Sequence, residues 1–71
     1  EQTIIREERL NALRTAIGKL KHEQRTALVL YTYENFSYQE IADVLNCSLS
    51  KVESLIFRAK KNLQTLLKHE R

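Results

Sequence analysis

The sequence contains no proline and a single glycine, Gly18, so little in it interrupts an α-helix. Its few aromatic residues, three tyrosines and two phenylalanines, are scattered along the chain, as are valine and threonine. None of these residue types alternates with polar residues, and strands are therefore not predicted. We expect an all-α fold.

Cysteine is equally scarce. Cys47 alone cannot form an intramolecular disulfide, and one free thiol is typical of a protein of the reducing cytoplasm. Together with His22 and His69, it supplies too few and too scattered ligands for a zinc site, so we predict no metal and no cofactor. No apolar run approaches the ~20 residues of a membrane span, and no signal peptide is visible. We expect a cytoplasmic location and no membrane partner.

Sequence motifs for catalysis are also missing. The chain has no glycine-rich phosphate loop and no motif that pairs a nucleophile with a base, and its carboxylates are dispersed. We therefore expect that it is not an enzyme. A chain of 71 residues without methionine, beginning at Glu1, is expected to be one small domain excised or processed from a longer product.

The charge is modestly basic, with 12 Lys and Arg against nine Asp and Glu, a net charge of +3 and a pI near 9.3. Much of the basic excess follows Lys51, which favours an acidic partner for that part of the chain.

A short amphipathic helix is predicted after Ser37. Ser37 and Glu40 have the spacing of a capping box at its start. Asn46 stands where the helix must stop, and asparagine tolerates the left-handed conformation that a C-cap requires. The apolar positions have helical spacing and are Tyr38, Ile41, Ala42 and Leu45.

A longer helix is predicted after Cys47. Two residues compete to cap it, Ser48 and Ser50, and Ser50 would form a second capping box with Glu53. One face is aliphatic and predicted to be buried: Val52, Ile56, Ala59, Leu63 and Leu66. The opposite face is basic: Lys51, Ser54, Arg58, Lys61 and Lys68. Such a helix suits a core on one side and a polyanion on the other, although a solvated basic face is the simpler interpretation.

These two helices carry a family resemblance. Residues 8–67 resemble region 4 of bacterial sigma factors, most closely the extracytoplasmic-function group. The matching motifs are the segment from Leu20 to Arg25, then SYQEIA from Ser37 to Ala42, Val52, and the run Arg58-Ala59-Lys60.

The sequence departs from the family's pattern at Lys21 (usually Pro), Asn35 and Asn46 (usually Gly), Glu53 (often basic) and Leu55 (often Arg). Both asparagines replace glycine with a residue that accepts a positive φ, which we predict at both positions. Leu55 lies beside the apolar face, and we assign it to packing.

The resemblance implies a small four-helix domain with a C-terminal helix-turn-helix at residues 8–71, preceded by a linker or frayed N-terminus at residues 1–7. A first helix carries the stripe Leu10, Leu13, Ile17 and Leu20, and a break is expected at Lys21-His22. A second helix, from about Glu23 to Tyr33, is apolar almost all round, which predicts a central position or a second face buried against a partner. Phe36 is expected to pack on Ile41 as a hydrophobic staple.

By resemblance, the long helix faces the minus-35 element of a promoter. The sigma factor to which such a domain belongs directs RNA polymerase to initiate transcription. Helix-turn-helix proteins place the N-terminal part of their second helix in the major groove. The candidate DNA-binding residues are Ser50, Lys51, Glu53, Ser54, Phe57, Arg58 and Lys61. The implied partners are promoter DNA and the β flap of the RNA polymerase core, on which the N-terminal helices of region 4 dock, with an anti-sigma factor as a further candidate.

Glu53 is unusual near a surface that faces phosphates. We favour a capping box with Ser50, and the alternative is that its carboxylate accepts a hydrogen bond from the N4 amino group of a cytosine.

Two other functions stay open for the whole chain. One is a regulator of the response-regulator type with a related four-helix domain, against which the Phe57-Arg58-Ala59-Lys60 run argues. The other is a module that chiefly binds protein, either the polymerase flap or an anti-sigma factor.

Overall fold

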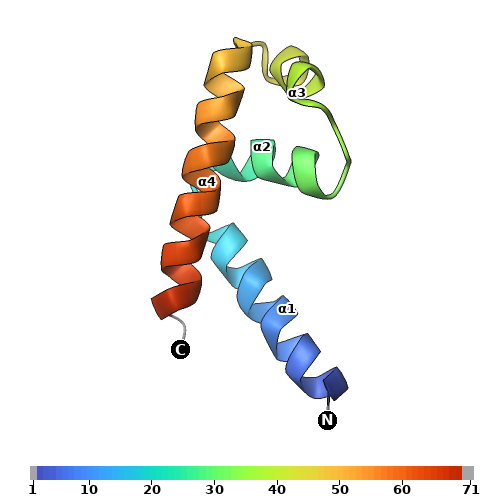
Figure 1. The fold of residues 1–71 in the computed structure, drawn as a ribbon, viewed down its shortest axis with the longest axis vertical. Coiled ribbons are helices and arrows are strands. Elements are labelled where there is room, and N and C mark those ends of the chain that lie inside the picture. The colour runs from blue at the N-terminus through green and yellow to red at the C-terminus, as the bar shows by residue number, and fades with distance from the viewer. Residues whose placement is uncertain (1, 70–71) are drawn as a thin grey trace.

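The computed structural model describes the backbone of residues 2–69 and the side chains of residues 7–68. Over this range the fold consists of four helices, α1 (Gln2–Gly18), α2 (His22–Thr32), α3 (Tyr38–Leu45) and α4 (Leu49–His69). The other three helices all pack against α4, which runs along the molecule's 43 Å long axis (Figure 1). The predicted all-α, four-helix fold is confirmed. No helix within the described range is both long and apolar enough to cross a membrane.

The buried face of α4 contributes residues to two hydrophobic clusters, which lie one after the other along the helix. The upper cluster joins α2, α3 and the first half of α4 through Ala27, Ile41, Ala42, Val52, Leu55 and Ile56. The lower cluster contains Leu20, Leu28 and Ala59, with Leu63 and Leu66 packed against it. The predicted aliphatic face of α4 is thus confirmed, as is the assignment of Leu55 to packing, since only 7% of its surface is exposed.

The connection between α1 and α2 is tight. α1 ends at Gly18, whose carbonyl accepts a 3.0 Å hydrogen bond from Arg25 Nη1 on α2. Lys21 is the N-cap of α2 with an extended backbone, which confirms the predicted break at Lys21-His22. A side chain of α2 therefore satisfies a carbonyl that the last turn of α1 leaves without a helical partner.

α1 departs from the predicted pattern in two ways. Its backbone is helical from Gln2 onward, within the segment 1–7 that the sequence places before the domain. Whether this segment is a linker in a longer protein stays a prediction. The expected apolar stripe is only partly buried, because Leu20 is 6% exposed whereas Leu10 is 42% exposed. The N-terminal end of the stripe therefore contributes little to the core.

The turn between α2 and α3 depends on Asn35, which has φ 58°. Just beyond it, the Phe36 N–H donates to the Leu30 carbonyl at 3.0 Å, which closes the end of α2. The Phe36 side chain packs against the upper cluster, to which Ile41 belongs, as expected of a hydrophobic staple. α2 itself packs on both α3 and α4, so its expected central position is confirmed for the face that carries Ala27 and Leu28.

Candidate nucleic-acid interface

The first helix of the helix-turn-helix is capped at both ends by its own sequence. The Ser37 hydroxyl accepts from the Glu40 N–H at 3.1 Å, and Glu40 Oε1 accepts from the Ser37 N–H at 2.7 Å. These reciprocal hydrogen bonds form the predicted capping box. At the other end Asn46 is left-handed, with φ 55°, and the Cys47 N–H donates to the Ala42 carbonyl at 3.0 Å. This Schellman-type ending turns the chain sharply toward α4.

The cap of α4 is Ser48. Its hydroxyl accepts a 3.1 Å hydrogen bond from the Lys51 N–H, and the helix begins at the next residue, Leu49. The favoured interpretation, a capping box between Ser50 and Glu53, is therefore wrong. Ser50 already lies within the first turn, where its side chain no longer faces the free N–H groups, and Glu53 lies beyond that turn.

All seven predicted DNA-binding residues lie on α4, and all seven are exposed: Ser50, Lys51, Glu53, Ser54, Phe57, Arg58 and Lys61. At about 100° per residue, Ser54 and Lys61 point almost directly away from the buried Val52. Phe57 is the most exposed large hydrophobic residue of the described part, at 67%. Its exposure leaves an apolar side chain available for contact on the outward face of the helix. The structure thus brings the predicted residues onto one solvent-facing surface. Whether they bind DNA stays a proposal.

The cations near this surface differ in their partners. Lys51 Nζ forms an ion pair with Glu23 Oε2 on α2 at 3.3 Å. Lys60 Nζ lies 5.5 Å from the ring centroid of Tyr31, within the range of a cation–π interaction. Arg58 and Lys61 have no such partner among the described residues. These two cations are therefore the ones most readily available to an external polyanion.

A polar contact joins α4 to α2 in addition to their apolar packing. Asn62 Nδ2 donates a 2.9 Å hydrogen bond to Oε1 of Gln24, a polar side chain that is only 6% exposed. Tyr31, which contacts Lys60, also lies against Tyr38 at the start of α3, with ring centroids 5.1 Å apart. α2 thus orients both helices of the helix-turn-helix.

The residues of α2 that act on the candidate surface, Glu23, Gln24 and Tyr31, are absent from the sequence-based prediction. Each is far from its α4 partner in sequence; Gln24 and Asn62 are 38 positions apart. No local periodicity links such pairs, because their proximity depends on the angle at which α2 crosses α4. Gln24 gave no signal of its own in the sequence, because it stands in the polar run from His22 to Thr26 at the start of α2.

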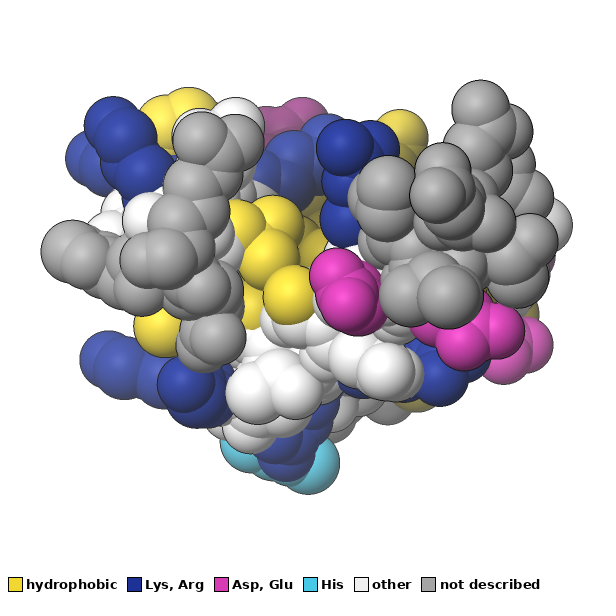
Figure 2. All heavy atoms as spheres, turned by 90° about the horizontal axis from the view of Figure 1, so that it is seen from below, with side chains coloured by type: hydrophobic (Ala, Val, Ile, Leu, Met, Phe, Trp, Pro, Cys, Tyr) yellow, Lys and Arg dark blue, Asp and Glu magenta, His cyan; other side chains and the backbone are white. Residues whose placement is uncertain are grey.

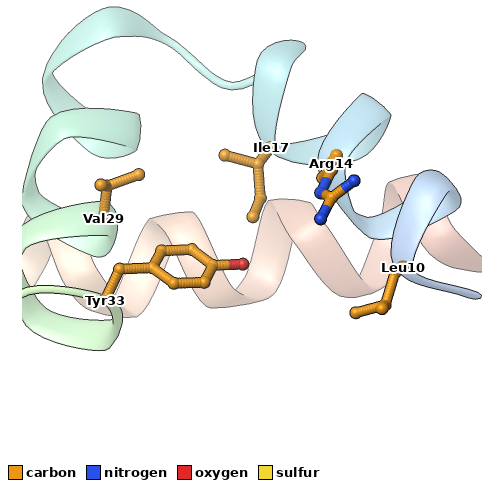
Figure 3. Close-up of a pocket in the computed structure, with 5 residues that line it drawn as sticks. All are labelled: Leu10, Arg14, Ile17, Val29 and Tyr33. Atoms are coloured by element: carbon orange, nitrogen blue, oxygen red, sulfur yellow. The ribbon is translucent and has the colours of Figure 1, made fainter.

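A second surface feature lies away from the outward face of α4. A groove of about 340 Å³ separates α1 from α2 and is lined by Leu10, Arg14, Ile17, Val29 and Tyr33. The Tyr33 ring extends from α2 toward α1, and Ile17 points into the same space (Figure 3). Hydrophobic side chains, flanked by basic and acidic ones, are also visible from the end of the molecule where both termini lie (Figure 2).

No group of three or more potential metal ligands occurs in the part of the chain that the structure describes. Cys47, one of the three dispersed candidates, is half-buried against the upper cluster in the turn before α4. His22 lies at the start of α2, and the side chain of His69 is outside the described residues.

Comparison with known proteins assigns these features to one family. The profile of "Sigma-70, region 4" matches residues 10–63. RNA polymerase sigma factor YlaC of Bacillus subtilis is 37% identical over 75 residues, covering all of this chain and 43% of the relative. RNA polymerase sigma-H factor of Pseudomonas aeruginosa is 39% identical over 72 residues, covering 96% of this chain and 37% of the relative. ECF RNA polymerase sigma factor EcfG of Rhodopseudomonas palustris is 37% identical over 54 residues, covering 76% of this chain and 30% of the relative. The chain thus spans less than half the length of each of these relatives.

Proposed function

Because the chain belongs to the sigma-70 region 4 family, of the extracytoplasmic-function type, we propose that it recognises the minus-35 element of promoters and so directs RNA polymerase to initiate transcription. In this proposal it acts in the cytoplasm as part of a sigma factor, and its partners are promoter DNA and the polymerase core. The relatives bear the names of RNA polymerase sigma factors, which supports the polymerase as partner.

The observation that carries the proposal is the exposure of one face of α4 from Ser50 to Lys61. α3 holds this end of α4 through the upper cluster, yet leaves its outward face uncovered (Figure 1). That arrangement lets the N-terminal part of the second helix enter a major groove, the docking geometry of helix-turn-helix proteins.

The exposed residues divide into three chemical roles. Ser50 and Ser54 are small enough for close approach to base edges, while Arg58 and Lys61 contact phosphates or a guanine. Phe57 presents an apolar ring suited to contact with a thymine methyl group. Glu53 has no capping role, and its carboxylate is the group on this helix that can accept from a cytosine N4 amino group.

The groove between α1 and α2 is the surface we assign to the polymerase β flap. Its lining is mainly apolar, and Leu10 and Tyr33 remain 42% and 55% exposed. Exposed apolar surface of this kind is typical of a protein-binding site. It lies on different helices from the candidate DNA surface, so both partners can bind at once. An anti-sigma factor that covered this groove would compete with the polymerase.

Selection from a pool of randomised duplex DNA tests the proposed function. The wild-type chain should enrich a short common motif, and Arg58→Ala should reduce affinity for that motif by roughly tenfold or more through loss of a phosphate or guanine contact. Lys68→Ala is the matched control, because Lys68 is exposed on the same helix but lies far from its N-terminal turns. An unenriched pool, or equal losses for the two variants, would contradict the proposal.

A further inference from the structure

The ion pair between Glu23 and Lys51 joins the first turn of α2 to the first turn of α4 (residues 23 and 51). The carboxylate oxygen lies 3.3 Å from the ammonium nitrogen, and the two side chains remain 61% and 49% exposed. Both groups are thus accessible to a ligand that approaches from solvent. Since the pair is exposed, it contributes little to the stability of the fold. Its more important effect concerns the external anions that Lys51 can bind.

The charges around the start of α4 explain why a carboxylate lies there. The N-terminus of a helix carries a partial positive charge and favours an anion. The first turn of α4 contains no acidic residue and instead carries Lys51, whose backbone N–H is engaged by Ser48. Glu23 brings the missing negative charge from α2, where it also lies in a first turn and is favoured by the dipole of its own helix.

We infer that Glu23 is an intramolecular counter-anion that occupies Lys51 and lowers the attraction of α4 for DNA phosphates. A phosphate that approaches Lys51 meets an ammonium group already neutralised by Glu23, and it must displace the carboxylate or lie beside it. This inference rests on the proposed function, in which α4 faces DNA. It assigns to Glu23 a role in setting affinity, exerted through Lys51 and not through contact with a base.

The ion pair should also change how strongly DNA affinity depends on salt concentration. A cation that neutralises a phosphate releases condensed counterions, and each such contact steepens the dependence of affinity on salt. Lys51 should contribute little to that dependence while Glu23 is charged. Removal of the Glu23 charge should restore one full phosphate contact, and the log–log salt slope should become steeper by about one unit.

The test uses the 71-residue chain and a labelled 20-base-pair duplex of mixed sequence, with binding followed by fluorescence anisotropy between 50 and 200 mM salt. Glu23→Gln should tighten binding roughly 3- to 10-fold at the low-salt end, with the steeper slope. Glu8→Gln is the matched control, because it changes the net charge equally from an exposed position on α1, far from the start of α4 (Figure 1). It should alter binding by less than about twofold, since charges separated by more than a Debye length are largely screened.

The Lys51→Gln background separates two ways in which Glu23 could act. If Glu23 acts by neutralising Lys51, the gain from Glu23→Gln falls to the level of the Glu8→Gln control when Lys51 is absent. A gain of equal size in both backgrounds would mean direct repulsion of phosphate and would overturn the inference.

In the otherwise wild-type chain, Lys51→Gln should also weaken binding less than Lys61→Gln does, since Lys61 has no anionic partner among the described residues. This comparison keeps the inference testable if Glu23→Gln does not fold.

The outcomes also distinguish this inference from the proposed function. If the wild-type chain binds, Arg58→Ala weakens binding and Glu23→Gln matches Glu8→Gln, then the inference fails and the DNA-binding function stands. If neither the wild-type chain nor Glu23→Gln binds the duplex at any salt concentration, both are overturned.

Discussion

Asn62 on α4 donates a 2.9 Å hydrogen bond to Gln24 on α2, a side chain that is 94% buried. The contact joins two helices that also pack through apolar residues, among them Ala27 and Leu28 of α2 and Val52 and Ala59 of α4. Asn62 directly follows Lys61, one of the α4 residues that are assigned to DNA. The hydrogen bond therefore adds a directional contact to an interface in which apolar residues of α2 and α4 also pack together.

Asn62→Leu should destabilise the chain by about 1–3 kcal/mol, because it leaves the buried Gln24 amide oxygen without a partner. Thermal and urea unfolding followed by circular dichroism measure this loss. Gln64→Leu, an exposed position two residues along the same helix, is the control and should change stability by less than about 0.5 kcal/mol. Replacing both members of the pair by leucine should recover most of the loss. Equal stabilities for Asn62→Leu and Gln64→Leu would show that the hydrogen bond has no structural role.

The two candidate caps of α4 make opposite predictions. Ser48→Ala should cost about 0.5–2 kcal/mol, because the Lys51 N–H loses its acceptor. Ser50→Ala should be close to neutral, since Ser50 lies inside the helix and alanine is the better helix former. Melting temperatures of the two variants decide between them. A larger loss for Ser50→Ala would restore the capping box that the structure excludes.

The left-handed residues Asn35 and Asn46 should respond alike to substitution. Glycine at Asn46 should be neutral or mildly stabilising, whereas valine should cost about 1–2 kcal/mol through left-handed strain. The same pair of substitutions at Asn35 gives an independent replicate, because φ is 58° there and 55° at Asn46. If the glycine and valine variants melted at the same temperature, the left-handed assignment would be wrong.

The sequence was most informative where the structure depends on local chemistry. Ser37 with Glu40 predicted a capping box, and Asn35 and Asn46 predicted positive φ, because each feature depends on neighbouring residues alone. The choice between Ser48 and Ser50 was beyond prediction, since both serines satisfy the local rules and the exit from the turn decides which one precedes the helix. The pairs Glu23–Lys51 and Gln24–Asn62 were beyond prediction for a different reason. They exist because α2 crosses α4 at a particular angle, and no spacing in the sequence encodes that angle.

The Ser48 cap removes the capping interpretation of Glu53 and leaves the contact with a cytosine. With the capping box excluded, Glu53→Ala should leave the free energy of unfolding within about 0.5 kcal/mol of wild type. If its carboxylate accepts from a cytosine, the variant should lose about 1–3 kcal/mol of discrimination at one C·G pair of the selected motif. Binding to each of the four base pairs at every position of that motif measures the effect. Uniform tightening across all sequences would instead show that Glu53 only repels phosphates.

We expect the outward face of α4, and not the groove between α1 and α2, to bind DNA. A titration of the ¹⁵N-labelled chain with the selected duplex, followed by amide chemical shifts, tests it most directly. We expect the largest shifts at Ser50, Ser54, Phe57, Arg58 and Lys61, with those at Leu10, Ile17 and Tyr33 near the noise. Shifts concentrated at Leu10, Ile17 and Tyr33, or spread evenly over all four helices, would contradict it.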